Sequence, residues 1–68
     1  MPRSPMLGAR LRRLRKDRGL TQVKLAEILG VSPSYLNMIE HNDRPLTVSL
    51  LLKLSEVLGV DLRDFSAG

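Results

Sequence analysis

Apolar residues recur at helical spacing along most of the chain, and glycine interrupts this pattern at three places. Intervals of three and four residues between apolar positions are typical of helices that bury one face. Gly19, Gly30 and Gly59 each follow such a segment, at the position where a left-handed residue commonly ends a helix. These signals predict helices at about 6–18, 22–29, 33–41 and 48–58, and a short fifth helix at about 61–66.

Capping residues support these boundaries. Thr21, Ser32 and Thr47 stand directly before three of the helical segments, where a hydroxyl can accept a hydrogen bond from a free backbone N–H. Pro33 suits the first helical position, because proline lacks an N–H that would have no partner there. The two-residue alternation of a strand does not persist beyond a few positions. The expected fold class is therefore all-α, a compact domain of five helices, four plus one short.

The 68 residues suffice for one small domain. We expect this domain at 6–66, preceded by a flexible arm at 1–5. The longest unbroken run of large aliphatic residues is Leu50–Leu52, so no membrane-spanning segment is expected. No apolar stretch follows the basic N-terminus, as it would in a signal peptide, and the expected location is the cytoplasm.

Positive charge is concentrated in one segment of a chain whose formal net charge is +4. Residues 1–18 hold seven of the eleven Lys and Arg residues but one of the seven acids. A localised cationic patch is typical of proteins that bind nucleic acid, an anionic membrane surface or an acidic protein. Tyr35 and Phe65 are the only aromatic residues, which disfavours single-strand binding by base stacking.

The sequence offers little for catalysis or metal binding. It has no cysteine and His41 is its only histidine, which excludes zinc fingers, iron–sulfur clusters and multi-histidine sites within this chain. No nucleophile elbow, Gly-rich phosphate loop or metal-ligand spacing accompanies its Ser, His and Asp residues. We therefore expect no enzyme activity, no metal, no cofactor and no small-molecule ligand in this domain.

Residues 22–41 join two short helices through a tight connection. The connection has the length and composition of the turn in a helix-turn-helix unit: Gly30, Val31 and Ser32. Val31 would supply the apolar side chain that packs inside such a turn. Spacing alone leaves a plain helical hairpin as the alternative.

The second helix of this pair has two distinct faces. At about 100° per residue, Leu36, Ile39 and Glu40 share one side. Tyr35 lies at the border, and the other side carries short, polar, nearly uncharged residues: Ser34, Asn37, Met38 and His41. A face that meets only solvent usually carries Lys and Glu. A face in a DNA major groove favours short hydrogen-bonding side chains and an apolar group for the thymine methyl, so the pattern favours DNA reading.

Glu40 falls on the buried side of its helix, where an unpaired carboxylate is costly. Arg15 borders the apolar stripe of the first predicted helix and is the best-placed cation. We expect an Arg15–Glu40 ion pair that ties the two helices together and sets the angle of the reading helix. The alternative is a partly solvated glutamate at a helix end.

Motifs spread over about residues 7–65 occur together: Gly19-Leu20-Thr21-Gln22, Leu25-Ala26, Leu29-Gly30-Val31-Ser32, Tyr35-Leu36, Ile39-Glu40 and Leu58-Gly59-Val60. In combination they resemble the phage-repressor/Cro-like helix-turn-helix family. The stretch from Ser32 to Val48 is similar to the N-terminal domain of bacterial regulators of short-chain fatty acid metabolism. Those are longer proteins with a C-terminal ligand-sensing part, so the resemblance implies a DNA-binding fragment or a shortened relative.

The resemblance implies roles for single residues. Base edges are expected to meet Ser34 and Met38, with Tyr35 and Asn37 beside them, and the family's inter-helix ion pair matches Arg15 and Glu40. The expected phosphate contacts are Gln22, which matches the family's phosphate-clamping glutamine, and Thr21, Ser32 and Arg44, which match further family positions. Apart from the resemblance, we also expect phosphate contacts from Arg10, one of the cations of the first helix, and from His41 on the outer face of the reading helix. Pro33 stands where many phage-type members carry glutamine, so their base code does not transfer to this chain.

The leading interpretation is a sequence-specific double-stranded DNA binder that regulates transcription at the bacterial nucleoid. We expect a homodimer formed through helix 48–58 or a missing C-terminal domain, because surplus apolar residues surround Leu50 and Val57. Isolated surface leucines are the alternative explanation. The runner-up function is a protein-interaction module, such as an antitoxin or adaptor, that uses the same fold without reading bases.

Overall fold

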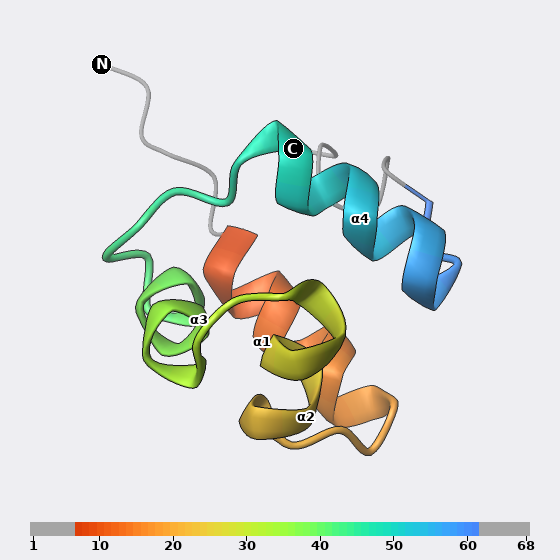
Figure 1. The fold of residues 1–68 in the computed structure, drawn as a ribbon, viewed down its shortest axis with the longest axis horizontal. Coiled ribbons are helices and arrows are strands. Elements are labelled where there is room, and N and C mark those ends of the chain that lie inside the picture. Colours follow the sequence, from red (N-terminus) through yellow and green to blue (C-terminus); the bar gives the residue numbers. More distant parts are fainter. Residues whose placement is uncertain (1–6, 62–68) are drawn as a thin grey trace.

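The computed structural model describes residues 7–61 (Figure 1). This part of the chain contains no strand and four helices: α1 (Leu7–Asp17), α2 (Gln22–Leu29), α3 (Pro33–Glu40) and α4 (Val48–Leu58). The all-α class is confirmed, and the ends of these helices lie within one residue of the sequence prediction. The predicted arm at 1–5 lies outside the described residues, as does the predicted fifth helix at 61–66 apart from Asp61, which is not helical.

Three helices begin at the predicted caps. The Thr21 hydroxyl accepts a hydrogen bond from the Lys24 N–H at 3.0 Å. The Ser32 hydroxyl accepts from the Tyr35 N–H at 3.1 Å, and Thr47 caps α4 in the same way. Each cap supplies an acceptor to a backbone donor that the first helical turn leaves free, which fixes where the helix starts.

The core lies where the four helices meet, and its fully buried side chains come from all of them: Leu11, Leu25, Leu36, Ile39 and Leu54. Figure 1 shows α3 on the left, α4 at the upper right and α2 at the bottom of the view, with α1 in the middle. α3 packs against both α1 and α2, whereas α4 packs against α2. The orientation of α3 is therefore set by α1 and α2.

The placement of surplus apolar residues in α4 corrects the sequence interpretation. Leu50 belongs to the core, with 8% of its surface exposed, and is not part of an outer patch. The exposed large apolar residues of α4 are Val57, as expected, at 44%, together with Val48 at 71% and Leu52 at 51%. Val48 and Leu52 lie about one turn apart on the same side of the helix, which is a small apolar surface. None of the helices within 7–61 is long and apolar enough to cross a bilayer.

Candidate nucleic-acid interface

α2 and α3 are joined by a short turn. Gly30 ends α2 in the left-handed conformation, with φ of 75°, which a residue with a side chain adopts only at a cost. The next residue, Val31, donates its N–H to the Ala26 carbonyl at 3.0 Å and packs its side chain against the core. Ser32 then caps α3. The turn thus fixes the two helices relative to each other, as a helix-turn-helix unit requires.

The two faces of α3 differ as the helical angles predict. Leu36, Ile39 and Glu40 are buried, with at most 4% of their surface exposed. Tyr35 is half-buried, and the exposed residues of the outer face are Ser34, Asn37, Met38 and His41. The outer face carries no Lys, Arg, Asp or Glu, so a partner can approach without displacing a charged side chain.

The structure places Arg15 of α1 against Glu40 of α3. Arg15 Nε donates to Glu40 Oε2 at 2.7 Å, and Arg15 Nη2 donates to Glu40 Oε1 at 3.1 Å. The third guanidinium donor, Nη1, binds the Leu20 carbonyl at 2.9 Å. The Glu40 side chain is fully buried and that of Arg15 is 11% exposed. This bidentate contact fixes the relative direction of the two side chains as well as the distance between them, so it orients α3 relative to α1.

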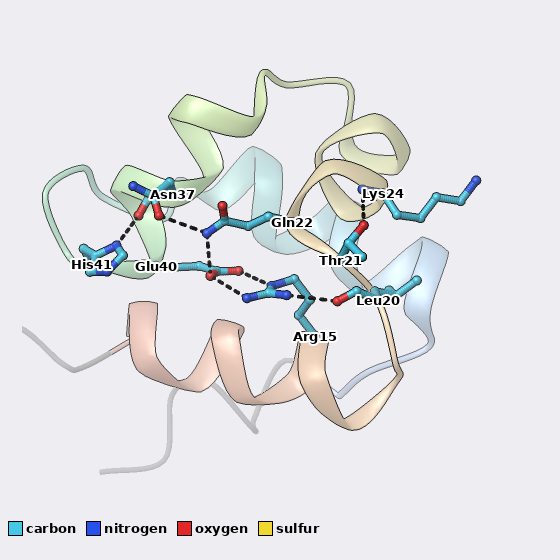
Figure 2. A network of polar contacts seen from close by, with 8 residues as sticks. All are labelled: Arg15, Leu20, Thr21, Gln22, Lys24, Asn37, Glu40 and His41. Carbon is cyan, nitrogen blue, oxygen red and sulfur yellow. Dashed lines mark hydrogen bonds and ion pairs between the residues drawn. The ribbon is translucent and has the colours of Figure 1, made fainter.

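Gln22, the first residue of α2, extends this contact to the outer face of α3 (Figure 2). Its Nε2 group donates to Glu40 Oε1 at 3.1 Å and to Asn37 Oδ1 at 3.0 Å. The chain of contacts therefore runs from α1 through the buried carboxylate to an exposed amide. Periodicity within a single helix gives no signal for a contact of this kind, and the sequence analysis did not identify it.

His41 closes the C-terminal end of α3. Its Nδ1 lies 2.8 Å from the backbone carbonyl oxygen of Asn37 (Figure 2). Because a carbonyl oxygen only accepts, Nδ1 donates and Nε2 is the nitrogen left for an outside partner. The imidazole is exposed and lies beside Asn37, at the edge of the outer face.

The other residues expected at DNA phosphates lie on separate segments. Thr21 and Ser32 are exposed at the starts of α2 and α3, and their hydroxyls serve as caps. Arg44 is exposed in the connection between α3 and α4, and its N–H donates to the Met38 carbonyl at 3.3 Å. Arg10 is exposed on α1. Arg10 and Arg44 therefore lie on different segments of the chain, α1 and the connection after α3.

A shallow, open depression of about 370 Å³ lies beside Glu40. Its lining comes mostly from successive turns of α1: Ala9, Arg12, Arg13, Lys16, Asp17 and Glu40. Three of these side chains are cations, and the Glu40 carboxylate is already bound by Arg15. The depression is therefore a positively charged surface next to the Arg15–Glu40 contact.

Two further residues hold α1 against α3, and the sequence analysis did not single out either. A Cβ atom on Gly8 would overlap the backbone oxygen of Ile39 and would lie 2.8 Å from that of Glu40. The Gly8 N–H donates to Asn42 Oδ1 at 3.0 Å, and Asn42 itself has a φ of 63°. Glycine in the first turn of α1 therefore permits the close approach of the two helices. A glycine within the predicted helix 6–18 is the one signal that could have drawn attention to it.

Polar groups inside the described region are satisfied. Within 7–61, every buried side-chain nitrogen or oxygen has a hydrogen-bond partner. In the same range no group of three or more His, Asp or Glu residues is arranged to hold a metal ion.

The turn, the capped helices and the buried ion pair define a helix-turn-helix domain. A helix-turn-helix family model matches residues 11–65, and the chain belongs to this family. The HTH-type transcriptional regulator RamB of Mycobacterium tuberculosis is 54% identical over 61 residues, which are 90% of this chain and 13% of RamB. The propionyl-CoA carboxylase regulator of Cereibacter sphaeroides is 49% identical over 55 residues, which are 81% of this chain and 12% of that protein.

A solved structure also supports membership of the helix-turn-helix family. The crystal structure of the clp gene regulator ClgR from C. glutamicum matches with a TM-score of 0.82 and 37% identity, covering 91% of this chain and 80% of that one. The resemblance to Cro-like helix-turn-helix proteins and to regulators of short-chain fatty acid metabolism is thereby confirmed. Both curated relatives are named as regulators, and the chain spans about an eighth of their length.

Proposed function

We propose that this chain is the DNA-binding domain of a bacterial transcriptional regulator and that α3 reads base edges in the major groove of double-stranded DNA. The observation that carries the proposal is the outer face of α3, which is exposed, polar and uncharged on a helix whose angle is fixed by a buried ion pair. A helix held at one angle can bring the same side chains to the same base pairs in each complex.

The base-reading side chains are Ser34, Tyr35, Asn37 and Met38. Serine and asparagine offer hydrogen bonds to base edges, and methionine offers an apolar contact to a thymine methyl group. Tyr35 is half-buried and lies at the border of the face, so it contributes its exposed edge. These contacts choose the sequence, whereas phosphate contacts fix the position of the protein on the duplex.

The phosphate contacts come from helix starts and from cations around the reading face. The N-termini of α2 and α3, at Thr21, Gln22 and Ser32, present free backbone N–H groups and the positive ends of helix dipoles. Arg10 and Arg44 add side-chain donors around α3, and His41 joins them through Nε2 when its imidazole is protonated, the form in which both ring nitrogens donate. The cationic depression on α1 adds positive potential beside Glu40 and draws the duplex toward this side of the domain.

We further propose that the regulator binds DNA as a homodimer in the bacterial cytoplasm, at the nucleoid. A second copy of the chain is the partner that fits a two-fold operator whose half-sites lie about one helical turn, ~34 Å, apart. Val48 and Leu52 on α4 offer a small exposed apolar surface for this contact. Sedimentation equilibrium with and without a two-half-site duplex measures the assembly, and one copy per duplex at saturation excludes it.

Binding-site selection from randomised duplexes tests the base-reading proposal. We expect an enriched motif, a binding constant that falls steeply with salt, and a narrower preference for the wild-type chain than for Ser34→Ala. Equal binding to selected and scrambled duplexes would contradict base reading.

The runner-up function, a protein-interaction module, is favoured by the same exposed residues of α4. It predicts that no motif is enriched and that salt has little effect on binding to the partner protein. The selection experiment therefore separates the two functions.

A further inference from the structure

The side-chain oxygen of Asn37 is already bonded within the protein, although the residue lies on the exposed face of α3. Gln22 Nε2 donates to Asn37 Oδ1 over 3.0 Å. In Figure 2 the side-chain nitrogen of Asn37 points away from Gln22. The part of Asn37 that a duplex meets is therefore its Nδ2 group, which carries two N–H donors.

The orientation of this amide follows from charges deeper in the domain. Arg15 can only donate, and the ionised carboxylate of Glu40 can only accept. The amide of Gln22 must therefore turn its Nε2 toward Glu40 Oε1, which lies 3.1 Å away. The second N–H of the same Nε2 group then faces Asn37, which has to present its oxygen. Each contact leaves one orientation for the next, from the arginine to the exposed amide.

We propose that Gln22 is a positioning residue for base recognition: it holds Oδ1 of Asn37, turns the Nδ2 donors of Asn37 outward, and so selects guanine over adenine at the base that Asn37 meets. This inference rests on the proposed DNA reading by α3. In the major groove, guanine presents two acceptors, N7 and O6, whereas adenine presents one acceptor and the N6 donor. An unrestrained asparagine pairs with adenine through both its oxygen and its nitrogen. Asn37 Oδ1 keeps a second lone pair, but Gln22 holds this oxygen toward α2, away from the side on which the Nδ2 donors point, which disfavours that second bond.

The geometry also divides the functions of Gln22 between its side chain and its backbone. Both N–H groups of Nε2 are used inside the protein, so contact with a phosphate falls to the backbone N–H at the start of α2. If the side chain held only a phosphate, its loss would weaken binding to all sequences alike. Under the present inference its loss changes the base preference at one position.

Binding-site selection with four matched chains tests this: wild type, Asn37→Ala, Gln22→Ala and the double variant. The wild type is expected to prefer guanine over adenine about tenfold at one position of the half-site, as a good paired contact allows. Asn37→Ala removes that preference at that position alone. Gln22→Ala frees the Asn37 amide to rotate, and the preference falls to about twofold or less because adenine is admitted. The double variant matches Asn37→Ala.

Two controls keep the experiment specific. Ser34→Ala is expected to change a different position and to leave the guanine preference intact. Thermal unfolding verifies that each variant is folded at the temperature of the selection.

A separate measurement tests the hydrogen bond between Gln22 and Asn37 without DNA. The side-chain NH₂ resonances of Gln22 in a ¹⁵N spectrum are expected to shift in Asn37→Ala and to stay in place in Ser34→Ala.

The outcomes distinguish this inference from the proposed function. A wild-type motif whose guanine preference persists in Gln22→Ala, or whose Asn37-dependent base is adenine, overturns the inference and leaves DNA reading by α3 in place. Gln22 resonances that do not move in Asn37→Ala also overturn it. Failure of the wild type to enrich any motif overturns the proposed function, and the inference with it.

Discussion

Arg15 in α1 and Glu40 in α3 are 25 residues apart in the sequence and are joined by two hydrogen bonds of 2.7 and 3.1 Å in the interior of the domain. The carboxylate is fully buried and has a further donor in Gln22. Because the contact is bidentate, it fixes the rotation of α3 as well as its distance from α1. The outer face of α3 therefore has one orientation relative to the rest of the molecule.

Arg15→Gln is expected to destabilise the domain by about 3 kcal/mol, because it leaves a buried carboxylate without its cation. Urea unfolding measures the change. Arg13→Gln is the matched control, since Arg13 is exposed on the same helix and its loss is expected to cost less than about 0.5 kcal/mol. Similar stabilities for the two variants would mean that the ion pair contributes nothing to the fold.

Gly8→Ala is expected to destabilise the domain by about 1–3 kcal/mol, although alanine is the better helix former. The added Cβ would overlap the Ile39 carbonyl oxygen, so α1 and α3 would have to separate. The reverse change at the neighbouring exposed position, Ala9→Gly, is expected to cost only about 0.5–1 kcal/mol. A rise in melting temperature for Gly8→Ala would show that the two helices do not approach this closely.

Asn42 combines a left-handed backbone with a hydrogen bond from the Gly8 N–H. Asn42→Ala loses both advantages and is expected to cost about 2 kcal/mol. Asn42→Gly keeps the backbone conformation and loses only the hydrogen bond, so about 1 kcal/mol is expected. Chemical unfolding of the two variants ranks their stabilities. If Asn42→Ala is as stable as Asn42→Gly, the left-handed backbone at this position carries no cost for alanine and that part of the explanation is wrong.

Arg44→Gln is expected to weaken binding to all duplexes by a similar factor. It should also lower the slope of log binding constant against log salt concentration by about 0.9, the value for one lost phosphate contact. Lys53→Gln, which removes an exposed cation from α4, is the control and should leave the slope unchanged. An altered base preference in Arg44→Gln, with the slope intact, would assign the residue to base reading instead.

Local signals in the sequence were enough to place the helices. Thr21, Ser32 and Thr47 act over three residues, and a glycine in the left-handed conformation ends α2 at Gly30. Such short-range contacts depend little on the rest of the fold, so their positions can be predicted from sequence. The burial of Glu40 followed from the periodicity of a single helix.

Contacts between helices were harder to predict. The hydrogen bond from Gln22 to Asn37 spans 15 residues and that from Gly8 to Asn42 spans 34, so both depend on how three helices pack. Periodicity shows which side of a helix is buried and not which residue it meets there. In α4 apolar residues occur on several sides, and the sequence analysis therefore misplaced Leu50, which lies in the core.

The most direct test of base reading by α3 is a titration of the ¹⁵N-labelled chain with its selected duplex, followed by backbone amide shifts. The largest changes are predicted at Gln22, Ser34, Met38 and Arg44, with smaller changes at Val48 and Leu52 of α4, and a scrambled duplex should move α3 much less. Changes confined to α4, or equal changes in α3 with both duplexes, would contradict the account.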